Sequence, residues 1–150
     1  MQKYVFFRYL CRMNRLEYWC RAKTQYNIHS PFMFDLYSAV LFARMPSERR
    51  AVEHPRSLCE RRFHELRYKF EDYFSLRLER EWPEPHSVLL EGDGEVRRVM
   101  IVCGPHKSRA AEREWALMCA DEGFQVSVDM FDVGVLIANS RLHRQHFILR

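Results

Sequence analysis

Apolar residues recur with helical spacing through the first half of the chain. Residues 3–23 carry an apolar stripe at intervals of three and four positions, which predicts a helix. A second apolar helix is predicted from Ser30 to about Ala43, because serine caps free backbone N–H groups and Pro31 suits the first helical position. A strongly charged helical pattern with one apolar stripe covers residues 56–81. The prolines of "WPEP" at 82–85 should end it.

The pattern changes to that of strands from residue 87 onward. Residues 87–90 and 96–102 flank the turn "EGDGE", which favours a hairpin. Ser108 can cap a helix that ends near Glu122, and "FQVSVDMF", "VLIA" and "HFILR" have the composition of further strands. We expect residues 99–102, the helix and residues 126–130 to form a right-handed crossover unit.

These elements predict one α/β domain over residues 1–150. Residues 1–82 should be helical, and residues 87–150 should form a strand-rich half-sheet with one crossover helix. A chain of 150 residues that is 47% hydrophobic suits a single core.

Composition narrows the location of the protein. No run of about 18 apolar residues occurs, so no membrane span is expected. Arginines interrupt the apolar N-terminus and no small-residue cleavage site follows, so we interpret it as part of the mature protein. The five cysteines are odd in number and form no CxxC pair, which argues against a disulfide framework or a zinc site. Reduced thiols and a cytoplasmic location are therefore predicted.

Positive charge is concentrated in the first half of the chain. Residues 1–70 carry a net charge of +8, whereas residues 71–150 carry −4. Arg8, Arg12 and Arg15 share one face of the first predicted helix and form a candidate basic patch. Such a patch could face nucleic acid, another acidic partner or a membrane surface, although a solvated face is the commoner explanation.

Two distant stretches resemble one protein family. "YNIHSPFMFDLYSAVLF" follows a basic aromatic segment, and "VMIVCGPHKSRAAEREW" precedes "VSVDMFDVGVLIA" and "HFILR" near the end of the chain. In this order they resemble a group of bacterial class I S-adenosylmethionine-dependent methyltransferases. Members of that group carry an "HGVHSPF" string near the start, and they end with a buried strand, an acidic loop, a tryptophan-bearing helix and a closing hairpin. The resemblance covers residues 1–45 and 96–150.

The chain departs from this family where the cofactor would bind. The family holds the cofactor with a strand, a glycine-rich turn and a helix, and with an acid after the next strand, much as dinucleotide sites do. Residues 46–95 contain neither feature. In the remaining loop, Cys103 and Gly104 replace the family's paired aspartates, while His106 and Ser108 persist. The resemblance thus implies an incomplete Rossmann-like fold, in which a helical N-terminal half packs on a small mixed sheet like the C-terminal half of a class I methyltransferase.

Three functions remain open from the sequence. The favoured hypothesis is a non-catalytic, methyltransferase-like remnant that acts as a binding or assembly module, with no cofactor or metal. The first alternative is an S-adenosylmethionine-dependent methyltransferase with an atypical or shared site, for which His29, His106 and Asp129 are candidate catalytic residues. The second alternative is a nucleic-acid-binding module that uses the basic half and its interleaved aromatic residues.

Two further expectations concern thiols and assembly. Cys103 and His106 could belong to a metal or thiol site, but no third ligand is in view. The apolar strands "VMIV" and "VLIA" would leave an unpaired edge if the rest of the family's sheet is missing, and unpaired edges promote association. We therefore predict a homodimer, with the sheet edge or the aromatic N-terminal helix at its interface.

Overall fold

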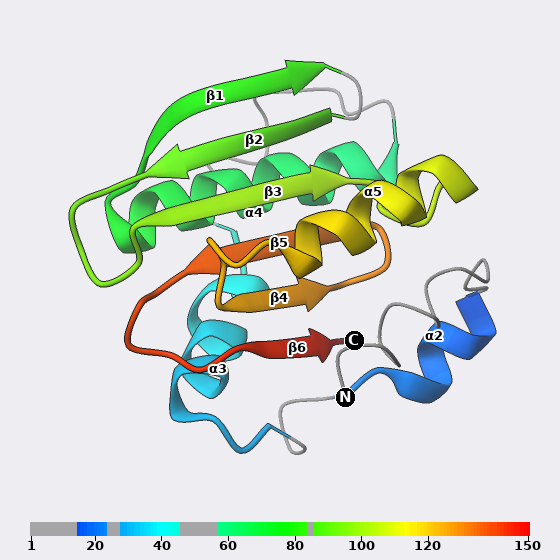
Figure 1. Ribbon diagram of the computed structural model, residues 1–150, viewed down its shortest axis with the longest axis horizontal. Helices are drawn as coiled ribbons and strands as arrows, with labels where there is room; N and C mark the ends of the chain where they lie inside the picture. The colour runs from blue at the N-terminus through cyan, green and yellow to red at the C-terminus, as the bar shows by residue number, and fades with distance from the viewer. Residues whose placement is uncertain (1–14, 24–27, 46–56, 84–85) are drawn as a thin grey trace.

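The protein is built around one open β-sheet (Figure 1). The computed structural model describes residues 15–23, 28–45, 57–83 and 86–150. The six-stranded sheet has the order β1-β2-β3-β5-β4-β6, and all neighbouring strands are antiparallel except β4 and β6. The strands are β1 (Arg77–Pro83), β2 (His86–Glu91), β3 (Arg98–Cys103), β4 (Val126–Asp129), β5 (Val133–Ala138) and β6 (Gln145–Ile148).

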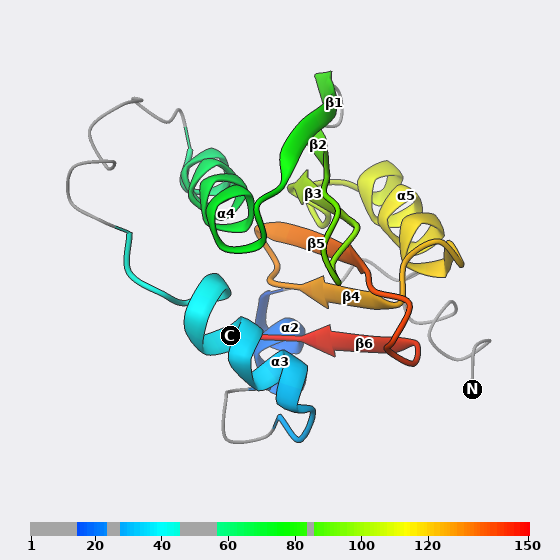
Figure 2. The same ribbon diagram turned by 90° about the vertical axis from the view of Figure 1, so that its left-hand side faces the viewer.

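Helices cover both faces of this sheet, as Figure 2 shows for α4 and α5. The helical elements are α2 (Arg15–Arg21), α3 (Pro31–Leu36), the π-helical turn η2 (Tyr37–Leu41), α4 (Leu58–Phe74) and α5 (Arg109–Ala120). Side chains from α3, η2 and α4 form the larger core with one face of the sheet. Tyr18 of α2 and Trp115 of α5 belong to a second core cluster on the other face. The structure is therefore a mixed α/β fold in three layers.

Two of the helices, α3 and α5, begin at the serine caps that the sequence predicted. The Ser30 hydroxyl accepts a hydrogen bond from the backbone N–H of Met33, and Pro31 occupies the first turn. Ser108 accepts from the N–H of Ala111 in the same way. The predicted helix from Ser30 continues beyond Leu36 as the π-helical turn and ends at Leu41. Of the helix predicted over residues 3–23, α2 lies at the C-terminal end, and residues 3–14 lie outside the described residues.

The crossover from β3 through α5 to β4 is present, with one change. Both β3 and β4 pair antiparallel with β5, so they run in the same direction, as the predicted crossover requires. However, β5 lies between them in the sheet. This arrangement brings the carboxyl ends of β3 and β4 to the same edge of the molecule.

The charged helix is shorter than predicted, and a strand follows it. α4 ends at Phe74, where Ser75 takes a left-handed conformation with φ of 54° and donates its N–H to the carbonyl of Glu71. Residues 77–83 then form β1, an exposed edge strand paired with β2. Helical spacing misled the prediction here because pairing with a neighbouring strand, which is not visible in the periodicity, decides the conformation.

The sheet has no apolar edge of the kind that the homodimer prediction assumed. β3 and β5, which contain "VMIV" and "VLIA", are each flanked on both sides by other strands. One edge is β1, whose residues are mostly exposed and charged. At the other edge, the N–H of Lys23 donates to the carbonyl of Ile148, and the N–H of Arg150 donates to Lys23. The strands "VMIV" and "VLIA" therefore leave no unpaired edge, contrary to the prediction, and a homodimer stays a prediction through the N-terminal helix, of which α2 is the described part.

Among the residues that the structure describes, no helix is both long and apolar enough to cross a membrane.

Candidate functional site

A cleft of about 620 Å³ lies at the carboxyl end of β3, beside the turn that follows β4. Its walls come from the loop after β3, the β4–β5 turn, the first turn of α4 and the β1–β2 hairpin. They include Gly104, Lys107, Phe131, Asp132, Cys59, Cys103, Glu60, Glu81 and His86. Open α/β sheets commonly bind ligands outside the carboxyl ends of their strands. The cleft is therefore the natural candidate for a binding site.

In the wall of the cleft, a buried histidine, His106, joins two carboxylates. Nδ1 of His106 lies 3.1 Å from a carboxylate oxygen of Glu112, and Nε2 lies 2.6 Å from Oδ2 of Asp129. All three side chains are buried. Burial alone lowers the pKa of His106, but the hydrogen bonds and charges of Asp129 and Glu112 outweigh it and hold the pKa above its ordinary value. The imidazolium form can donate to both carboxylates at once.

The same network fixes the turn after β4. Oδ1 of Asp129 accepts the N–H of Phe131 at 2.9 Å, and Phe131 takes a left-handed conformation with φ of 66°. The Phe131 ring stacks on His106 with 5.3 Å between ring centroids. From α2, the Tyr18 hydroxyl lies within hydrogen-bond distance of two carbonyl oxygens, those of Leu149 and of Asp129, the latter at 3.0 Å. A residue in a rarely populated backbone conformation that several buried contacts hold in place is typical of a functional site.

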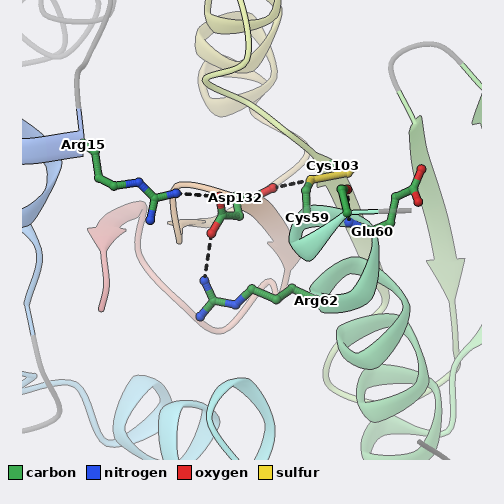
Figure 3. Close-up of a disulfide and its surroundings, with 7 residues drawn as sticks. Arg15, Cys59, Glu60, Arg62, Cys103 and Asp132 are labelled. Carbon is green, nitrogen blue, oxygen red and sulfur yellow. Dashed lines mark hydrogen bonds and ion pairs between the residues drawn. A yellow bond between two sulfur atoms is a disulfide. The ribbon is translucent and has the colours of Figure 1, made fainter. Parts of the chain in front are cut away.

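Asp132 connects this turn to two helices (Figure 3). Its carboxylate oxygens lie 3.3 Å from the guanidinium groups of Arg15 in α2 and Arg62 in α4. Arg15 is also stacked over the Phe131 ring, 4.8 Å from the centroid. The Arg15 side chain remains 62% exposed, so this ion pair is strongly screened by water.

A disulfide joins Cys59 to Cys103 in the wall of the cleft (Figure 3). It links the first turn of α4 to the end of β3, across 44 residues of sequence. The prediction of reduced thiols is wrong for this pair, because partners so far apart show no spacing signal. Cys20 and Cys119 are free, and Cys11 lies outside the described residues.

The structure brings together two of the three candidate catalytic residues. His106 and Asp129 are in direct contact, whereas His29 is exposed just before α3 and takes no part in this network. Sequence reasoning missed Glu112, although a charged residue on the apolar face that holds Ala111 and Trp115 was a usable signal.

The remaining site predictions concern the basic patch and metals. Of the proposed patch, only Arg15 is described, and it binds Asp132; Arg8 and Arg12 lie outside the described residues. Within the described ranges, no group of three or more His, Cys, Asp or Glu side chains is placed to hold a metal ion.

Comparison with known proteins gives no assignment, since no family model, no curated protein and no solved structure matches the chain. What the fold itself defines is a mixed α/β protein with an open, mostly antiparallel sheet and a cleft at the carboxyl end of β3.

Proposed function

We propose that this protein is a non-catalytic, methyltransferase-like binding module whose cleft is the binding site. The connection between β3 and α5 carries the proposal. It is the one passage from a strand directly into a helix among the described residues, and Gly104 is its single glycine. A methyltransferase cofactor site needs a glycine-rich turn at such a passage, as related dinucleotide sites do.

The order of elements is consistent with the resemblance seen in the sequence. A buried strand, β3, leads through a loop with His106 and Ser108 into α5, which bears Trp115. The β4–β5 hairpin follows, and β6 closes the sheet with "QHFI". These features support a shared ancestry with the C-terminal half of a class I methyltransferase.

The buried histidine also favours binding over catalysis. A general base needs a ring nitrogen that can take a proton from a substrate. Both nitrogens of His106 are already hydrogen-bonded to carboxylates, and its side chain is almost fully buried. His106 therefore has a structural role in this proposal: at the wall of the cleft, it ties α5 to β4 through Glu112 and Asp129.

A second candidate function is an S-adenosylmethionine-dependent methyltransferase with an atypical or shared site. The contact between His106 and Asp129 at the cleft is the observation that favours it. It would require that a ligand or second subunit rearrange the network of Glu112, His106 and Asp129. The main proposal keeps the cytoplasmic location, with the Cys59–Cys103 disulfide as an exception to the reduced thiols expected there.

Nuclear magnetic resonance on the ¹⁵N-labelled chain tests where ligands bind. A library of small polar fragments should shift the amide signals of Gly104, Lys107 and Asp132 more than that of Leu78, which lies on the exposed strand β1. Fragments that consistently bind elsewhere would overturn the proposed site. Shifts at the cleft induced by S-adenosylmethionine, accompanied by methyl transfer, would favour the second candidate.

A further inference from the structure

We propose that the Cys59–Cys103 disulfide is a redox-active site that exchanges with a small thiol of the glutathione class entering the cleft. This inference rests on the position of the disulfide in the cleft wall and on its neighbours, and does not depend on the absence of methyltransferase activity. It would hold for either function proposed above.

The disulfide is placed where a small molecule can reach it. Both cysteines line the cleft and are half-buried rather than enclosed in the core. Cavities of about 300–1,000 Å³ hold ligands of drug size, so a cleft of about 620 Å³ has room for a tripeptide thiol. The cleft walls carry the carboxylates of Glu60, Glu81 and Asp132 and the ammonium group of Lys107. The carboxylates can face the amino group of such a ligand, and Lys107 can face one of its carboxylates.

The two sulfur atoms differ in their surroundings. Cys59 is the second residue of α4, a helix of 17 residues whose N-cap is Ser57. The partial positive charge at a helix N-terminus stabilises a thiolate, and the better-stabilised thiolate is the better leaving group. Cys103 ends a β-strand and has no such helix behind it. On this ground we expect exchange to begin at Cys103 with Cys59 as the leaving sulfur. The carbonyl oxygen of Asp132, 2.9 Å from Sγ of Cys59, opposes a lasting thiolate there and favours its prompt protonation to the thiol.

The reaction balances with the thiol as the reductant. The thiolate of the small molecule attacks Sγ of Cys103, a new sulfur–sulfur bond forms, and the Cys59–Cys103 bond breaks. Cys59 leaves as a thiolate and takes a proton from water. A second thiolate then attacks the mixed disulfide at the small-molecule sulfur, which releases the oxidised small disulfide and leaves Cys103 as a thiolate. Two thiols are oxidised and the protein disulfide is reduced.

The reduced form has a hydrogen-bond acceptor already in place. Sγ of Cys59 lies 2.9 Å from the backbone carbonyl oxygen of Asp132 (Figure 3). Once protonated, the Cys59 thiol can donate to this oxygen without moving the helix. The backbone N–H of Gly104 also donates to this carbonyl oxygen, at 2.8 Å, and holds the acceptor in position. The fold can thus hold both redox states of the pair.

The test uses the full chain, purified without reductant and kept folded. Reduced glutathione is added in excess, and samples are quenched in acid and analysed by intact mass and peptide mapping. We expect loss of the Cys59–Cys103 bond, with a transient adduct of one glutathione on Cys103. The variant C59S, exposed to oxidised glutathione, should hold an adduct on Cys103 at least about tenfold longer, because the resolving thiol is gone. C119S, which alters a free cysteine outside the cleft, should behave as the wild type.

Several results would overturn the proposal. One is alkylation of both Cys59 and Cys103 in the untreated folded protein, because the bond would then not exist. An adduct on Cys59 instead of Cys103 would contradict the assigned leaving group. If C59S does not fold, the wild type still decides the question. The rate at which glutathione reduces the Cys59–Cys103 bond is compared between the folded protein and the protein in concentrated urea. A rate in the folded protein within about tenfold of that in urea supports the proposal, and a larger difference identifies a purely structural bond.

Discussion

Replacing Asp129 by alanine should destabilise the protein more than any comparable change on β4. The side chain is fully buried and makes two contacts, to Nε2 of His106 at 2.6 Å and to the N–H of Phe131 at 2.9 Å. Breaking a buried charged pair by removing one partner costs about 3–5 kcal/mol. The free energy of unfolding of a small domain is only about 5–15 kcal/mol. Asp129→Ala should therefore remove at least about a fifth of it, and most of it if the domain lies at the lower end of that range.

Two variants calibrate this value. Ser127→Ala, on the same strand, removes the uncharged contacts of its hydroxyl with His146 and Cys119, for which a net loss of about 1–2 kcal/mol is expected. Asp129→Asn keeps an oxygen that can accept the Phe131 N–H and should lie between the two. Urea unfolding followed by circular dichroism measures all three. If Asp129→Ala costs no more than Ser127→Ala, the buried network does not hold the turn as we argue.

Further predictions concern pH, packing and assembly. Because the pKa of His106 is raised in the folded state, its contribution to stability should be complete below about pH 6.5 and should be lost as the pH rises through the folded pKa. The free energy of unfolding of the wild type, measured with urea, should therefore fall over this pH range, whereas that of H106Q should not. Gly134→Ala would place a Cβ 2.5 Å from the ring of buried Trp115, so its urea midpoint should drop by an amount equivalent to about 1–3 kcal/mol, and an unchanged midpoint would refute this contact. Leu16 on α2 is 75% exposed, and Leu117 on α5 is 62% exposed. If a homodimer forms through α2, light scattering should show a dimer that L16E dissociates and that the control L117E leaves intact. A monomeric wild type would contradict the predicted homodimer.

Structural features that depend only on residues close together in the sequence could be predicted. The β2–β3 hairpin follows from apolar strands around "EGDGE", and the start of α5 follows from Ser108 before a periodic apolar face. The strand that contains Asp129 follows from alternation in "FQVSVDMF". In each case the turn, cap or period that decides the structure lies within the element itself.

Features that depend on distant partners could not be predicted. β1 exists because residues 77–83 pair with β2, although their own spacing is compatible with a helix. The insertion of β5 between β3 and β4 removed the open edge that we expected, and strand order leaves no trace in periodicity. Cys59 of α4 and Glu112 of α5 reach the site only because the fold brings these two helices beside the end of β3. Of the candidate site, the sequence therefore indicated His106 and Asp129 as separate candidates beside His29, but neither their contact nor the partners Glu112 and Cys59.

Titration calorimetry with S-adenosylmethionine tests the central claim most directly. The folded chain is titrated at cofactor concentrations up to the millimolar range, and the same samples are assayed for methyl transfer. Because the β3–α5 passage has a single glycine and both nitrogens of His106 are engaged, the account predicts no saturable heat and no transfer. Saturable binding that is lost on substitution of cleft residues such as Lys107 would contradict it and establish a cofactor site of a new kind.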